Sequence, residues 1–271
     1  MYSSNIVYLF SSLVKNRSLV AQLLYRDIFT KYKGLLLGVA WAAILPLVML
    51  SLYTFVFGTL FKARWSNGEA SSSTTEYALM LFLGLIVHGL FAEVLARAPG
   101  AILSQPNFVK KVVFPLELLP IAILGSGVFN LIVGAAIWIV VAVYFDVEPS
   151  LTWLYLPIIL IPAILMATGL SWMLAAFGVF FKDISQFSGI ATTLLLFMAP
   201  ILYPISLIPE KFQSFLYLNP LTSIVTELRG VMFYGQNPSI EYLIVAFISC
   251  ILFWGGFFFF QRLRGAFADV I

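Results

Sequence analysis

The amino-acid sequence predicts an all-α polytopic membrane protein. Of its 271 residues, 62% are hydrophobic and only 10% are charged, and the mean hydropathy is +1.02. Charged residues make up about a quarter of a typical soluble domain, so this composition excludes that class. The chain also contains several apolar stretches of the length that crosses a bilayer as a helix.

A helix needs about 20 apolar residues to cross about 30 Å of hydrocarbon. Stretches of this kind predict six transmembrane helices, over residues 35–61, 77–95, 113–145, 153–181, 188–203 and 242–260. We expect one domain over residues 1–271, in which residues 35–261 form the six-span bundle and residues 262–271 a cytoplasmic tail.

The segment before the first span, residues 1–34, has a different pattern. Apolar residues recur there at steps of three and four, between basic residues such as Lys15 and Arg17. This pattern is typical of an amphipathic helix that lies on the membrane surface. The alternative is a solvated, partly disordered tail.

The segment between the fifth and sixth spans, residues 204–241, contains apolar pieces that are too short to cross the bilayer. Asn219 and Pro220 separate them. We expect short re-entrant helices that dip into the outer leaflet.

The distribution of Lys and Arg predicts the orientation, because cytoplasmic loops retain basic residues. With the N-terminus inside, eleven of the 15 basic residues fall on the cytoplasmic side and four fall outside. Both termini are therefore expected in the cytoplasm.

Several kinds of chemistry lack the residues they need. The sequence contains no G-x-x-x-x-G-K-[ST] phosphate loop, so any ATPase that drives the protein is another polypeptide. One His and one Cys supply no metal cluster and no intrachain disulfide, and a net charge of +3 gives no nucleic-acid surface. We expect no catalytic residue, cofactor or metal in this chain.

Polar residues inside the predicted spans are few. Glu93, one turn before Arg97, and Glu117 are both expected at the inner membrane interface. His88 and Asn130 lie deeper and are expected to bond a neighbouring helix. Without a series of buried acids, coupling to a proton or sodium gradient has little support.

Aromatic residues are candidates for the wall of a substrate channel, because their ring faces can stack on the C–H faces of sugars. Residues four apart share one face of a helix, and three of the candidates on the first span have that spacing. The alternative is an interfacial aromatic belt with lipid-facing rings. The candidates are Trp41, Tyr53, Phe57, Phe61, Phe197 and Tyr203.

The longest cytoplasmic loop between spans runs from Arg97 to Phe114 and has room for a short surface helix. An external motor subunit would have to bind there. The alternative is a connecting loop whose lysines reach lipid phosphates. The candidate coupling residues are Arg97, Asn107, Lys110 and Lys111.

Four segments resemble the membrane subunit of polysaccharide-exporting ABC transporters. In family order they are RDIFTKYKGLLLGVAWAAILPLVMLSLYTFVFGTLFKARW from Arg26, NFVKKVVFPLE from Asn107, APILYP from Ala199 and NPLTSIVTELRG from Asn219. They are most similar to the O-antigen, Wzm-like permeases, with capsule and teichoic-acid permeases as sister branches.

The resemblance implies a permease that is not itself an enzyme. Two copies would form a pore in the bacterial inner membrane, and two cytoplasmic ATPase subunits would bind ATP and magnesium. The substrate would be a polysaccharide on undecaprenyl diphosphate. The helix after Arg97 would insert into the ATPase, and the stretch after Pro204 would form outer gate helices. Basic residues of the N-terminal helix would flank the lipid entrance, where they would meet the diphosphate: Arg26, Lys31 and Lys33.

Two other functional classes stay open on the residues alone. One is a secondary carrier or channel that needs no ATPase. The other is an intramembrane enzyme, which would require His88, the one histidine of the chain, as its base.

Overall fold

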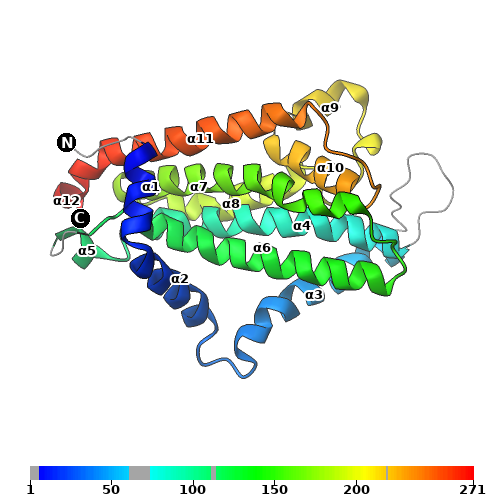
Figure 1. Cartoon of the computed structure of the whole chain (residues 1–271), viewed down its shortest axis with the longest axis horizontal. Helices are drawn as coiled ribbons and strands as arrows, with labels where there is room; N and C mark the ends of the chain where they lie inside the picture. Colours follow the sequence, from blue (N-terminus) through cyan, green and yellow to red (C-terminus); the bar gives the residue numbers. More distant parts are fainter. Residues whose placement is uncertain (1–5, 61–73, 111–113, 218) are drawn as a thin grey trace.

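The computed structural model describes residues 6–60, 74–110, 114–217 and 219–271. These residues form an elongated bundle of long helices, and α2 and α3 make a V that projects from its side (Figure 1). No strand occurs within the described ranges. The long helices are α4 (Thr74–Arg97), α6 (Leu118–Tyr144), α7 (Leu156–Phe180) and α11 (Tyr242–Leu263), and α3 (Trp41–Tyr53) forms a fifth long helical segment with the turns that flank it.

Shorter helices flank the bundle and occupy its two ends. They are α1 (Ile6–Lys15), α2 (Arg17–Tyr32), α5 (Pro106–Lys110), α8 (Ile184–Met198), α9 (Glu210–Tyr217), α10 (Pro220–Met232) and α12 (Phe267–Val270). A π-helical segment, Thr54–Leu60, continues α3. Short 3-10 turns join several helices, including Gly38–Ala40, Ala98–Gly100, Leu151–Tyr155 and Arg264–Ala266.

Five helical segments are long and apolar enough to cross a membrane. They are Gly38–Leu60, Thr74–Gly100, Leu118–Tyr144, Leu151–Phe180 and Tyr242–Val270. They coincide with five of the six predicted spans, because a long apolar run is a direct signal of such a helix.

The remaining predicted span, residues 188–203, is helical only in α8. This helix has 15 residues, so it is about 22 Å long at 1.5 Å per residue. It ends because Ala199, whose backbone is extended, precedes Pro200, and a residue before proline disfavours the helical conformation. The prediction carried the helix through that proline.

The N-terminal segment forms two helices, with a break at Asn16, where the sequence predicted one. The first, α1, buries Leu9 completely. The second, α2, packs on α6 and buries Leu23 and Tyr32. The N-terminal helices therefore pack against the bundle.

The most extensive packing between helices occurs between α4 and α6 and between α7 and α11. At the second crossing Gly169 faces Gly256, and a Cβ atom on either would overlap the backbone of the other helix. Small residues at such positions let membrane helices approach closely.

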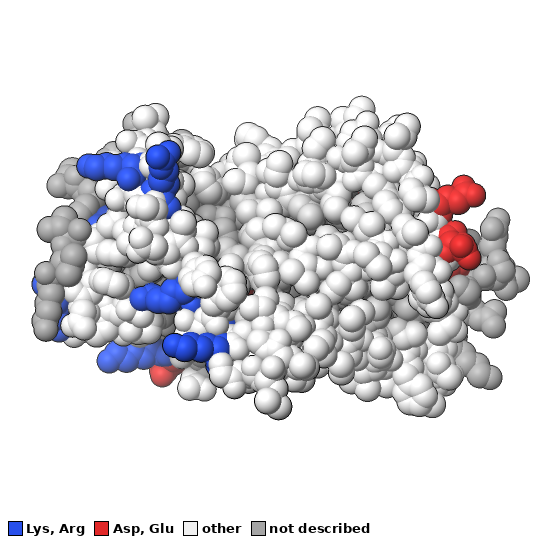
Figure 2. Space-filling model, turned by 60° about the horizontal axis from the view of Figure 1, so that its bottom comes forward, with Lys and Arg blue, Asp and Glu red and all other residues white. Residues whose placement is uncertain are grey.

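Charge separates along the bundle. Both chain ends and α5 lie at one end, while α9 and α10 lie toward the other (Figure 1). On the face drawn in Figure 2, Lys and Arg gather at the end with the chain termini, and Asp and Glu are prominent at the opposite end. This is the asymmetry that the positive-inside rule requires of a membrane protein.

Candidate functional site

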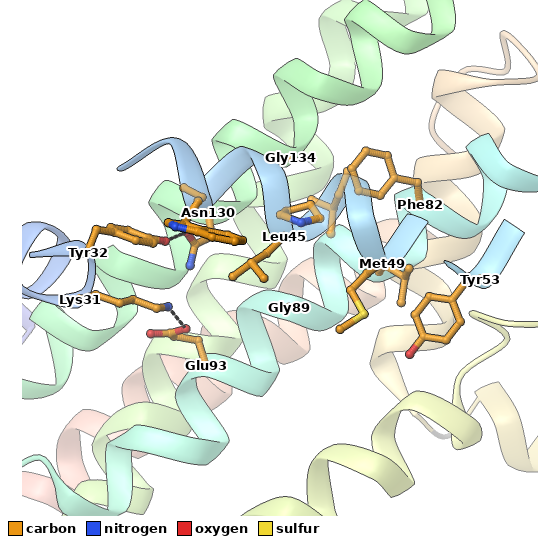
Figure 3. Close-up of a pocket in the computed structure, with 15 residues that line it drawn as sticks. Lys31, Tyr32, Leu45, Met49, Tyr53, Phe82, Gly89, Glu93, Asn130 and Gly134 are labelled. Carbon is orange, nitrogen blue, oxygen red and sulfur yellow. Dashed lines mark hydrogen bonds and ion pairs between the residues drawn. The ribbon is translucent and has the colours of Figure 1, made fainter. Parts of the chain in front are cut away.

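A cavity of about 370 Å³ opens between α3, α4 and α6, beside the end of α2 (Figure 3). Both arms of the V that α2 and α3 form contribute residues to its lining. Its lining residues are Lys31, Tyr32, Trp41, Ala42, Leu45, Pro46, Met49, Tyr53, Phe82, Leu85, Ile86, Gly89, Glu93, Asn130 and Gly134.

The cavity is polar at one end and apolar along the rest. At the polar end, the Lys31 Nζ lies 2.9 Å from Glu93 Oε2, and the Tyr32 hydroxyl donates a hydrogen bond to Asn130 Oδ1 at 3.2 Å (Figure 3). Burial raises the pKa of Tyr32 further above neutral pH, where a tyrosine hydroxyl is already protonated and can donate. Met49 lies toward the other end. Such a cavity suits an amphiphile rather than an ion.

A ladder of four charged side chains, called here the charged ladder, fastens α2 to α4 next to this cavity. The Arg97 guanidinium donates to both carboxylate oxygens of Asp27, at 2.5 and 2.9 Å, and to Glu93 at 2.6 Å. Lys31 completes it through Glu93. Two acids and two bases leave the ladder without net charge, and the fork of Arg97 fixes its geometry.

The ladder arises from two identical spacings in the sequence. Asp27 and Lys31 are four residues apart on α2, and Glu93 and Arg97 are four apart on α4. Residues four apart share a helix face, so each helix presents an acid and a base to the other. The predicted pair of Glu93 with Arg97 is confirmed, and the crossed pairs with α2 were missed.

The turn between α2 and α3 depends on glycine. Gly34 and Gly38 have φ angles of +84° and +52°, in the left-handed region that side chains other than glycine disfavour. Between them, Leu36 is fully exposed. The two glycines set the direction in which α3 leaves α2, and thereby the position of one cavity wall.

The five predicted channel aromatics that the structure describes divide between two places. Trp41 and Tyr53 line the cavity, and the rings of Tyr53 and Phe57 lie 6.2 Å apart on the same face. The Tyr203 hydroxyl donates to the Phe197 carbonyl at 2.6 Å, beyond the end of α8. The sixth, Phe61, lies outside the described residues.

The predicted entrance and coupling residues are also spread. Lys31 lines the cavity, whereas Arg26 and Lys33 are exposed on and just after α2. Arg97 is a member of the charged ladder. Asn107 and Lys110 are exposed on α5, and Lys111 lies outside the described residues.

Two polar residues of the predicted spans, His88 and Glu117, have partners in distant parts of the chain. His88 Nε2 lies 3.1 Å from the Thr192 carbonyl of α8, so the expected bond to a neighbouring helix is confirmed. Glu117, which was expected at the inner interface, lies directly before α6, and its side chain is fully buried and paired with Arg264 at 2.7 Å. The partner lies 147 residues away, which a local pattern cannot reveal.

A buried arginine joins three segments near the other end of the bundle. The Arg229 side chain of α10 donates to the Met80 carbonyl at 2.9 Å, to that of Pro200 at 2.5 Å and to that of Ile201 at 3.0 Å. Arg229 therefore holds α10 against α4 and against the segment that follows α8. A basic residue in an apolar stretch was the only signal in the sequence for these contacts.

Comparison with known proteins agrees with this architecture. The family model of the ABC-2 type transporters matches residues 18–233. An O-antigen export system permease protein, RfbA, of Klebsiella pneumoniae is 26% identical over 98% of this chain and 97% of its own length. The RfbA protein of Myxococcus xanthus is 24% identical over 98% of this chain and 100% of its own. The polysialic acid transport protein KpsM of Escherichia coli is 24% identical over 87% of this chain and 90% of its own. The resemblance to polysaccharide-export permeases is thus confirmed, and the chain belongs to the ABC-2 type transporter family.

Proposed function

We propose that this chain is the permease subunit of an ATP-driven exporter that moves lipid-linked polysaccharide across the bacterial inner membrane. The observation that carries the proposal is its similarity, over nearly its full length, to permeases named for O-antigen export. The substrate that we propose is O-antigen on undecaprenyl diphosphate.

In the proposed arrangement both termini and α5 face the cytoplasm, and α8 completes a sixth crossing. The gathering of Lys and Arg at the end with the termini supports this orientation (Figure 2). The short helices α9 and α10 then lie at the outer leaflet as gate helices. Two copies form the pore, with Trp41, Tyr53, Phe57, Phe61, Phe197 and Tyr203 as candidate contacts for sugar.

The cavity supports a lateral entrance for the lipid carrier. It has the Lys31–Glu93 ion pair, Tyr32 and Asn130 at one end and apolar walls along the rest, which fits a molecule with a polar head and a hydrocarbon chain. Arg26, Lys31 and Lys33 supply the cations near the head. The chain performs no covalent chemistry in this scheme, because ATP and magnesium are bound by the partner ATPase.

The short helix α5 is the proposed docking element for that ATPase. It presents exposed Asn107 and Lys110 at the end with the termini. We expect Lys110→Glu to weaken co-purification with the cognate ATPase, and Lys15→Glu, an exposed charge reversal on α1, to leave it unchanged. ATP hydrolysis by the purified chain alone, or gradient-driven transport without an ATPase, would refute the proposal.

A capsule-type substrate is the second candidate, because KpsM covers most of the chain at an identity close to that of the RfbA proteins. Complementation separates the two. The chain and its cognate ATPase are expressed in a strain that lacks O-antigen export and in one that lacks capsule export. Surface O-antigen in the first strain supports the assigned substrate, and capsule in the second supports the alternative.

A further inference from the structure

The most deeply buried ion pair of the described residues lies away from the cavity, at the end of the bundle that holds the termini. Glu117 is fully buried, and its carboxylate accepts from Arg264 Nη1 at 2.7 Å and from the Ser12 hydroxyl at 3.1 Å. The Arg264 side chain is only 8% exposed. A carboxylate is tolerated in such a place only when its partners hold it in a fixed geometry.

This pair, with Ser12, is called here the terminal clasp, because it joins segments from three parts of the chain. Ser12 lies on α1, Glu117 precedes α6, and Arg264 follows α11. Arg264 Nη2 also donates to the Phe114 carbonyl at 2.8 Å. The indole of Trp172, on α7, donates to the Glu117 carbonyl at 3.0 Å. Together these bonds tie α1, α7 and the end of α11 to the turn before α6.

The exposed helix α5 rests on the same turn. The ring of Phe108, on α5, stacks on that of Phe114 with centroids 4.3 Å apart and planes 11° from parallel. On the other side α5 contacts α12, whose Phe267 is fully buried against Phe180 and Phe260. A displacement of α5 therefore acts first on the two segments that carry Phe114 and Phe267. Both segments flank the clasp.

Hydrogen bonding at this end is incomplete in the present conformation. Gln261 lies one turn before Arg264 and is 3% exposed, and its amide finds no hydrogen-bond partner among the described residues. A buried amide without partners raises the free energy of the conformation that contains it. In this segment it is the Arg264 side chain that makes the hydrogen bonds to the turn before α6.

Resting on the proposed function, we propose that the terminal clasp is the positioning device that passes movement of α5 to α1 and α11. An ion pair of fixed geometry is either made or broken, so it converts a small displacement of α5 into a change between two arrangements. Glu117 and Arg264 are positioning residues, since they touch neither ATP nor the transported polymer. Their loss should uncouple ATP hydrolysis from export while the subunits stay assembled.

The test uses the permease with its cognate ATPase in proteoliposomes, and a fluorescent undecaprenyl-diphosphate oligosaccharide as the probe. The variants are Arg264→Gln, Arg264→Lys and the matched control Arg262→Gln, whose side chain is exposed two residues earlier. Three quantities are measured: recovery of the complex, the rate of ATP hydrolysis, and probe exported per ATP.

We expect Arg264→Gln to assemble and hydrolyse ATP at close to the wild-type rate, while export per ATP falls about ten-fold. Arg264→Lys keeps the charge but loses one bond, so it should recover part of the export per ATP. Arg262→Gln should match the wild type. Unchanged export per ATP in Arg264→Gln overturns the proposal, as does a loss of assembly with normal coupling in the complexes that remain.

If Arg264→Gln does not accumulate, Ser12→Ala and Arg264→Lys decide the matter. Reduced export per ATP in these milder variants supports the proposal, and wild-type values overturn it. Failure of the underlying function looks different, because the wild-type complex itself would then show no ATP-dependent movement of the probe.

Discussion

Gly169 and Gly256 face each other where α7 crosses α11, and each leaves room for the backbone of the other helix. A Cβ atom on Gly256 would overlap the Gly169 carbonyl group. The neighbouring Gly255 has nothing within 4 Å of an added Cβ. The close approach of these two helices therefore depends on one glycine of the pair 255 and 256.

Gly256→Ala should force α7 and α11 apart and lower the free energy of unfolding by about 3 kcal/mol, as overpacking does at a tight contact. Gly255→Ala is the matched control, and its stability should change by no more than about 0.5 kcal/mol. Unfolding by SDS titration in mixed micelles measures both. Equal stabilities of the two variants would contradict the packing described here.

Arg229→Met should lower the free energy of unfolding by about 3 kcal/mol, because three backbone carbonyls lose a buried charged donor. The free energy of unfolding of Arg229→Lys should lie between those of the wild type and Arg229→Met, because one ammonium group cannot reproduce the geometry of the guanidinium. Lys211→Met, at an exposed position on α9, serves as the control. The same SDS titration applies, and a wild-type midpoint for Arg229→Met would show that these bonds contribute little.

Gly89→Leu should fill the cavity without disturbing the fold. Gly89 lines it, and an added Cβ at this position meets nothing within 4 Å. If the cavity admits the lipid carrier, export in proteoliposomes should fall at least about ten-fold while ATPase binding stays normal. Gly255→Leu tests for a general effect of a new leucine. Normal export by Gly89→Leu would remove the cavity from the transport path.

The bond between Asp27 and Arg97 should be measurable in a double-mutant cycle with Asp27→Asn and Arg97→Gln. Both side chains are partly exposed, at 20% and 35%, so we expect a coupling energy of only about 1 kcal/mol that decreases with added salt. A cycle between Asp27 and the exposed Lys182 should be additive. Coupling that is independent of salt would indicate a drier site than the structure shows.

Much of the fold could be predicted from the sequence, because an apolar run of membrane length has few alternatives to a helix. Five of the long helices follow from such runs alone. The extent of α8 was not predicted correctly, although Pro200 carried the necessary signal. The break at Asn16 carried a signal as well, because asparagine is favoured at helix N-caps and Asn16 is the N-cap of α2.

Less of the candidate site could be predicted from the sequence. Lys31, Trp41 and Tyr53 were predicted individually, but their common cavity depends on how α2 turns into α3 at Gly34 and Gly38. The crossed pairs of the charged ladder depend on contacts 62 and 70 residues apart. Local spacing predicted only the pair within α4, where helix geometry alone decides the contact.

The terminal clasp also constrains the order in which the protein is made. Glu117 follows Ser12 by 105 residues, and Arg264 follows Glu117 by 147. While the ribosome is still adding the intervening helices, the carboxylate has its hydroxyl partner but no guanidinium, and a lone buried carboxylate is strongly unfavourable. Glu117 must therefore stay hydrated or protonated on the nascent chain, and the end of the bundle that holds the clasp closes only after Arg264 has been translated.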